Sequence, residues 1–156
     1  MLTTHIHDEL LPVSWRSRRG DFVSLMTLYE SNYVRLRNLV PALKAMEGTH
    51  TSIVAGDCPL LLRVEERGPY TTTLTLTYVF DTVAGQIADP DLQVRVYHDA
   101  RVAEVLSCAR WHRHEVLASI KSELYCQLGE RWLRNVMLNK WLDYCVERGH
   151  CFVNPK

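Results

Sequence analysis

The alternation of apolar and polar residues between Leu92 and Ser107 constrains the fold of this chain more than any other feature. Apolar residues at Leu92, Val94 and Val96 recur at every second position, which is the period of a β-strand with one buried face. Strand character resumes at Val102, so this segment predicts two short strands folded back on each other. A two-residue loop at Asp99-Ala100 would place His98 opposite Arg101, Val96 opposite Ala103, Arg95 opposite Glu104 and Val94 opposite Val105.

This register gives the predicted hairpin one core face and one hydrated face. Arg95 and Glu104 lie on the hydrated face and are expected to form a cross-strand ion pair, worth about 0.2–1 kcal/mol when exposed. Ala100 resists the positive φ that a two-residue loop demands, so a longer turn through His98 and Arg101 is the alternative. The core face carries Leu92, Val94, Val96, Ala103 and Val105, and the hydrated face carries Gln93, Arg95, Tyr97 and Glu104.

Polar side chains at and beside the turn make this hairpin the candidate binding site. One interpretation is catalytic, with His98 as general acid or base and Asp99 as the carboxylate that orients it. The other is a polar turn in which Asp99 bonds to its own backbone, and it is favoured because adjacent strand residues point to opposite faces. The predicted binding residues are Arg95, Tyr97, His98, Asp99, Arg101 and Glu104, with Arg63 as a further candidate, and none is assigned a catalytic role.

The hairpin segment VRVYHDARVAEV also resembles the central signature of the YqiB-like family, a set of bacterial proteins whose function is not established. Three further stretches are similar to the same family, so the resemblance spans roughly Asp21 to Gly149. It implies a fold and a bacterial cytosolic setting, and it implies no catalytic residues. The three stretches are MTLYESNYVRLRNLVP at Met26–Pro41, YTTTLTL at Tyr70–Leu76 and WLDYCVERG at Trp141–Gly149.

A single globular domain is expected for 156 residues of which 47% are hydrophobic and 23% charged. We place it at residues 21–149, after an N-terminal arm at 1–20 and before a C-terminal tail at 150–156. The 18 basic and 18 acidic residues balance, so no net field favours nucleic acid or an anionic membrane. No stretch reaches the ~18–20 apolar residues that span a bilayer. The N-terminus lacks the order of a signal peptide, and a cytoplasmic protein is predicted.

The other periodicities predict an α+β fold. An amphipathic helix is expected after Asp21 as N-cap, and a second helix from Glu130 to Arg148 is closed by Gly149. Short connections between them predict an antiparallel meander of about four to five strands, with both helices on one sheet face. The first helix stripe comprises Phe22, Leu25, Met26, Tyr29, Tyr33, Leu36 and Val40. Strands are expected at Ile53-Val54, Leu60–Glu66, Tyr70–Phe80 and the hairpin, and a loop is expected over Gly85–Asp91. The face of the Tyr70–Phe80 strand that carries Thr73, Thr75 and Thr77 is expected to be exposed or thinly packed. Residues 109–128 fit a strand, a loop or a helix.

Few residue sets carry a recognisable chemistry. Phosphate-binding glycine loops and common hydrolase motifs are absent from the sequence. We therefore expect a non-catalytic regulatory or adaptor domain that binds a protein partner through its sheet face. The sequence does not predict an oligomeric state. The alternative is a nucleotide- or metabolite-binding protein or hydrolase with its polar site at residues 95–104. Two sets, Cys108/His112/His114/Cys126 and Cys145/His150/Cys151, contain zinc-ligating atoms without the tight pairs of structural sites, so no metal or cofactor is predicted.

Overall fold

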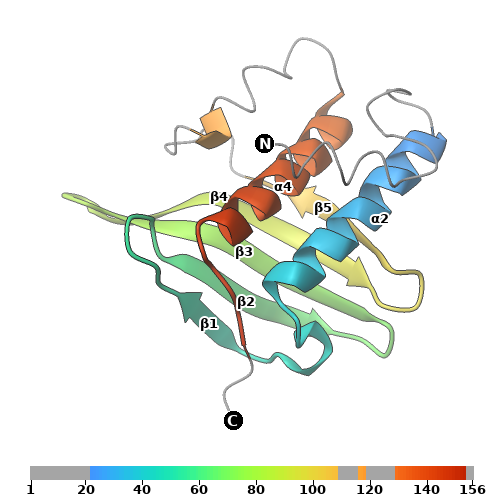
Figure 1. Ribbon diagram of the computed structural model, residues 1–156, viewed down its shortest axis with the longest axis horizontal. Helices are drawn as coiled ribbons and strands as arrows, with labels where there is room; N and C mark the ends of the chain where they lie inside the picture. The colour runs from blue at the N-terminus through green and yellow to red at the C-terminus, as the bar shows by residue number, and fades with distance from the viewer. Residues whose placement is uncertain (1–21, 109–115, 119–128, 154–156) are drawn as a thin grey trace.

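The computed structural model describes residues 22–108, 116–118 and 129–153. Its sheet has five antiparallel strands in the order β1-β2-β3-β4-β5, so each strand pairs with its neighbours in the sequence. Helices α2 and α4 lie side by side across one face of this sheet (Figure 1). The elements are α2 (Phe22–Leu39), the 3-10 helix η1 (Leu43–Ala45), β1 (Thr49–Ser52), β2 (Leu60–Arg67), β3 (Thr71–Thr82), β4 (Gly85–Tyr97), β5 (Val102–Ser107) and α4 (Glu130–Glu147).

This arrangement confirms the predicted α+β class, the antiparallel meander and the placement of both helices on one face. Helix α4 ends as expected, because Gly149 follows it at φ 97, where a residue with a Cβ is strained. None of the helices in the described part of the chain is long and apolar enough to cross a membrane.

The β4–β5 hairpin has the predicted register. Val94 pairs with Val105, Arg95 with Glu104 and Val96 with Ala103. Strand β4 ends at Tyr97 and β5 begins at Val102, so the longer of the two turns is the one formed. Asp99 Oδ1 accepts a hydrogen bond from the Ala100 N–H at 2.9 Å, which is the local bond expected of a polar turn. The five residues of the predicted core face, Leu92, Val94, Val96, Ala103 and Val105, are all buried.

The hydrophobic core lies between this inner sheet face and the two helices. Trp141 of α4 is fully buried and packs edge-on against Tyr78 of β3, with ring centroids 5.2 Å apart. The segment after α4 also contributes, because Phe152 is buried and its N–H donates to the Leu39 carbonyl at 2.9 Å. The end of the described chain is therefore fastened to the end of α2.

The loop expected over Gly85–Asp91 is wrong, because β4 is continuous from Gly85 to Tyr97. Its pairing with β3 shifts between Leu76 and Tyr78, which accommodates the cis Asp89-Pro90 bond and Asp91 at φ 51. A bulge tolerates proline, which cannot donate to the strand ladder. Gly85, Asp89 and Pro90 therefore lie in a strand, because β3 is long enough to pair with β4 along this stretch.

Two further strand expectations are corrected. The first strand is β1 at Thr49–Ser52, and Ile53 beyond it is largely exposed. Thr73, Thr75 and Thr77 are buried although they point away from the helices, because β3 is the central strand and longer side chains from its neighbours cover it. Arg95 donates to Thr73 at 3.3 Å, and Thr75 donates to Glu65 at 2.8 Å.

The contact between α2 and α4 is more polar than the predicted stripe implied. Phe22 is mostly exposed, whereas Leu28, outside that stripe, is fully buried. Asn135 Oδ1 accepts hydrogen bonds from Asn32 Nδ2 at 3.3 Å and from the Val105 N–H of edge strand β5 at 3.0 Å. Asn139 Nδ2 reaches Asn32 Oδ1 at 3.0 Å and Ser31 Oγ at 2.8 Å, and Arg35 Nε reaches Asp143 at 3.0 Å.

Several expectations fall outside the described residues: the arm at 1–20, the Asp21 cap, the continuation of the last strand over 109–115, and the helical alternative at Ile120 and Leu124. Residues 116–118 are helical.

Candidate functional site

The hairpin residues predicted to form one site lie in two places. Arg95, Tyr97 and Glu104 lie on the outer sheet face, which is the face opposite α2 and α4. His98, Asp99 and Arg101 lie in the turn and line a cleft against α2 and η1. Side chains alternate along a strand, so Tyr97 and His98 project to opposite sides and the hairpin serves two surfaces.

On the outer face, Tyr97 and Glu104 are joined by a short side-chain hydrogen bond. The Tyr97 hydroxyl donates to Glu104 Oε1 at 2.8 Å, and Arg95 Nε donates to Thr73. Burial, then the hydrogen bond and charge of Glu104, raise the pKa of Tyr97, while Arg95 opposes that shift. The direct Arg95–Glu104 ion pair expected from the register is absent among the ion pairs of the described residues, because tyrosine and threonine hydroxyls take these groups instead.

Glu104 is also within reach of the helix layer. Tyr29 of α2 hydrogen-bonds it, and burial followed by the Glu104 charge raises the pKa of Tyr29. Glu104 can contact residues on both faces of the sheet because β5 is its edge strand. Arg63, the further candidate, donates to Glu65 Oε1 at 2.9 Å on the same outer face.

The cleft lies on the helix side, at the C-terminal half of α2. Its volume is about 780 Å³, which is within the range of small-molecule sites. Arg67 lies nearby and donates to the carbonyls of Leu43 and Met46, which holds η1 against β2. The cleft is lined by Glu30, Tyr33, Val34, Arg37, Lys44, His98, Asp99, Ala100 and Arg101.

The pKa of His98 reflects the charges around this cleft. Its Nε2 lies 2.8 Å from Thr72 Oγ1, and its Nδ1 is buried without a hydrogen-bond partner. Burial lowers the pKa of His98, and the positive charges of Lys44, Arg67 and Arg37 lower it further, against Asp99. The potential at the imidazole is therefore positive, which favours an anion beside it.

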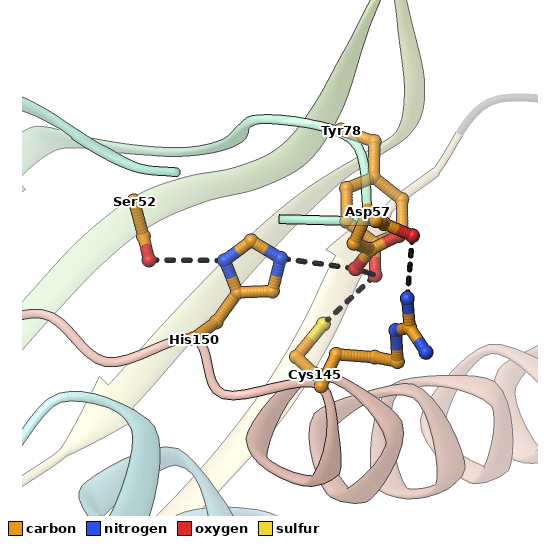
Figure 2. Close-up of polar contacts among 7 residues, drawn as sticks. Ser52, Asp57, Tyr78, Cys145 and His150 are labelled. Atoms are coloured by element: carbon orange, nitrogen blue, oxygen red, sulfur yellow. Dashed lines mark hydrogen bonds and ion pairs between the residues drawn. The ribbon is translucent and has the colours of Figure 1, made fainter. Parts of the chain in front are cut away.

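A second cluster of polar groups is buried at the other end of the sheet, where β1, β3, α4 and the C-terminal segment meet (Figure 2). Asp57 Oδ2 accepts a hydrogen bond from the Tyr78 hydroxyl at 2.8 Å and lies 3.0 Å from His150 Nε2. His150 Nδ1 is 2.9 Å from Ser52 Oγ, and the Tyr78 hydroxyl is 3.6 Å from Cys145 Sγ.

The pKa shifts in this cluster follow from its burial. Burial alone would raise the pKa of Asp57, but hydrogen bonds from Tyr78, from the Cys58 backbone N–H and from His150 outweigh it and lower that pKa. Burial raises the pKa of Cys145 to about 12 and also raises that of Tyr78. Cys145 is therefore an inert thiol at neutral pH.

Ser52, His150 and Asp57 are the residue types of a hydrolase triad, but their setting is structural. Ser52 is 8% exposed and His150 is 2% exposed, so neither is presented to a substrate. Asp57 is also hydrogen-bonded by Tyr78, so this side chain connects the loop after β1 to strand β3 and to the C-terminal segment. Within residues 22–108, 116–118 and 129–153, no three His, Cys, Asp or Glu side chains gather as a metal site. The zinc-type set at Cys108, His112, His114 and Cys126 lies partly outside those residues.

Sequence reasoning missed the Asp57–His150 cluster and the Arg37–Lys44 side of the cleft. Asp57 lies in the loop between β1 and β2 and His150 lies in the predicted C-terminal tail, and 93 residues separate them. No local signal connects such residues. The buried asparagines gave a weak local signal, since Asn135 and Asn139 are one helical turn apart within the apolar arc of α4.

The fold and these two surfaces define a small α+β domain with a helix-covered inner sheet face, a polar outer face and a basic cleft at the hairpin turn. The chain belongs to the family described as "Protein of unknown function (DUF1249)", whose model matches residues 35–151. This confirms the YqiB-like resemblance seen in the sequence.

The chain is 32% identical over 129 residues to "Uncharacterized protein YqiB" of Escherichia coli strain K12, covering 83% of this chain and 91% of the relative. The proteins of the same name in E. coli O6:H1 and O157:H7 match equally well. No solved structure gives a significant match.

Proposed function

We propose that this protein is a non-catalytic cytoplasmic adaptor domain that binds a protein partner through the outer face of its sheet. The observation that carries the proposal is a pair of neighbouring hydrogen bonds, Tyr97 to Glu104 and Arg95 to Thr73, on the sheet face opposite α2 and α4. Tyr and Arg are favoured at binding hot spots because each combines a large contact area with directional donors.

The geometry supports recognition because these side chains are already held in place. Glu104 fixes the Tyr97 hydroxyl at 2.8 Å, and Thr73 fixes the Arg95 guanidinium at 3.3 Å. Ordering a long side chain on binding costs about 0.5–1.5 kcal/mol, so a preordered group retains more of its contact energy. Thr73, which accepts the Arg95 hydrogen bond, is itself buried.

The test removes both charges and keeps a polar side chain at each position. Arg95→Gln combined with Glu104→Gln should abolish partner capture while the protein stays folded, because Gln can still donate and accept hydrogen bonds at these half-buried positions. A photo-crosslinking residue at position 93 of the same outer face, in living bacteria, should give a discrete crosslinked protein that the double variant loses.

The matched control changes the same charges on the opposite layer. Lys140→Gln combined with Glu147→Gln on α4 should leave the crosslinked product from position 93 unchanged. If wild type and the Arg95/Glu104 variant yield the same crosslinked proteins, the outer face is not the binding surface.

A further inference from the structure

We infer that the cleft between α2, η1 and the β4–β5 turn binds a phosphate group of a small phosphorylated molecule, held by Arg37, Lys44 and Arg101. This site lies on the helix side of the hairpin and is separate from the outer sheet face, so either proposal can fail without the other.

The cations of this cleft come from three separate elements. Arg37 lies on the last turn of α2, Lys44 lies in η1, and Arg101 lies in the β4–β5 turn. All three side chains are exposed, and each lines the same cleft of about 780 Å³. Positive charges that approach from three directions suit a tetrahedral phosphate, whereas one guanidinium already satisfies a planar carboxylate.

The acidic residues of the cleft do not cancel this charge. Asp99 has one carboxylate oxygen bonded to the Ala100 N–H, and Glu30 lies on α2 about two turns before Arg37. Arg67 adds a fourth positive charge that acts on His98, although its guanidinium is bound to backbone carbonyls. The lining thus has three cationic side chains against two carboxylates, and with Arg67 the positive charge is concentrated on the α2 and η1 side of His98.

The positions of Arg37 and His98 are held by the fold. Arg37 donates to the Tyr33 hydroxyl at 3.1 Å and lies over the ring of Tyr33, with the guanidinium carbon 5.9 Å from the ring centroid. His98 is anchored by Thr72 and by its N–H, which donates to the Tyr70 carbonyl at 2.8 Å. A preorganised donor set costs less to engage than flexible surface lysines.

The experiment uses pyrophosphate as the probe, measured by calorimetry and by NMR of the His98 ring at constant ionic strength. Pyrophosphate should bind, and Lys44→Gln and Arg101→Gln should each weaken it by roughly threefold to tenfold. The matched control Arg63→Gln removes an exposed arginine from the outer face and should leave the affinity unchanged.

His98 provides a readout that a distant site would not give. A bound anion favours the imidazolium, so saturating pyrophosphate should raise the pKa of His98. The charged groups that act on the His98 ring are Lys44, Arg67, Arg37 and Asp99.

Four outcomes would overturn the inference. Malonate or sodium chloride acting as strongly as pyrophosphate would indicate charge screening alone. A loss of binding in Arg63→Gln as large as that in Lys44→Gln would place the anion elsewhere, and so would His98 resonances that do not move while binding occurs. A single-stranded oligonucleotide that displaces pyrophosphate with an affinity growing with its length would make the ligand a polymer and not a small molecule.

Discussion

Asp57 is the residue on which the buried cluster depends, because it accepts hydrogen bonds from Tyr78 and His150 with one oxygen. Replacing it by Asn removes the charge and presents an amide where donors converge. We expect Asp57→Asn to lower the free energy of unfolding by roughly 1.5–3 kcal/mol at pH 7, the contribution of hydrogen bonds to a charged group. Urea unfolding measures it.

Asp81→Asn is the control for that substitution. Asp81 is exposed and accepts one hydrogen bond from Gln86, so its replacement should change stability by no more than about 0.5 kcal/mol. Equal losses for both variants would contradict a structural role for the cluster.

The same carboxylate predicts how stability depends on pH. The pKa of Asp57 in the folded protein lies below its ordinary value of 3.8, so the folded state holds this proton more weakly than the unfolded chain. Its contribution is present above pH 3.8 and is lost as pH falls from there through the lower folded pKa. Stability measured against pH should decline less steeply in Asp57→Asn below that value, and parallel profiles would refute the assignment.

At the scale of elements, the contact between α2, α4 and β5 depends on Asn135. Its Oδ1 serves both Asn32 and the Val105 N–H, so Asn135→Ala leaves buried donors without an acceptor. Each unsatisfied group costs about 1–3 kcal/mol, and we expect a loss in that range or above. Amide exchange at Val105 should accelerate beyond that of other β5 amides, because its hydrogen bond is removed locally.

Asn38→Ala on the exposed surface of α2 is the matched control, and it should be neutral or slightly stabilising because Ala favours helix. If Asn135→Ala is equally benign, the polar helix contact does not hold the edge strand.

At the scale of the molecule, the core cluster joins α2, β2 to β5, α4 and the C-terminal segment into one unit. Phe152→Ala should therefore destabilise the whole protein by about 3–5 kcal/mol, the cost of emptying a buried aromatic position. Circular dichroism and tryptophan fluorescence should shift together in one cooperative transition. Val153→Ala, at a largely exposed neighbour, should change little. Separate transitions for the two probes would mean that the C-terminal segment is not part of the cooperative unit.

The sequence by itself determined both long helices, strands β2 and β3 and the register of the hairpin, but it misplaced the first strand and predicted a loop where β4 begins. Alternation at Leu92, Val94 and Val96 can satisfy only a strand with one buried face, and a short turn leaves few ways to pair Arg95 with Glu104. These properties are local, since they depend on residues a few positions apart. The α+β class followed because amphipathic helices on either side of a meander must cover one sheet face.

Only the tertiary structure decided what those elements bring together. Ser52 and His150 are 98 residues apart, and Asn32 and Asn135 are 103 apart, so neither contact leaves a local pattern. Burial of the β3 threonines depended on the length of side chains in neighbouring strands, and the division of residues 95–104 between two surfaces depended on where α2 ends. A side chain's polarity is a property of its sequence position, but its partner is set by how distant elements pack.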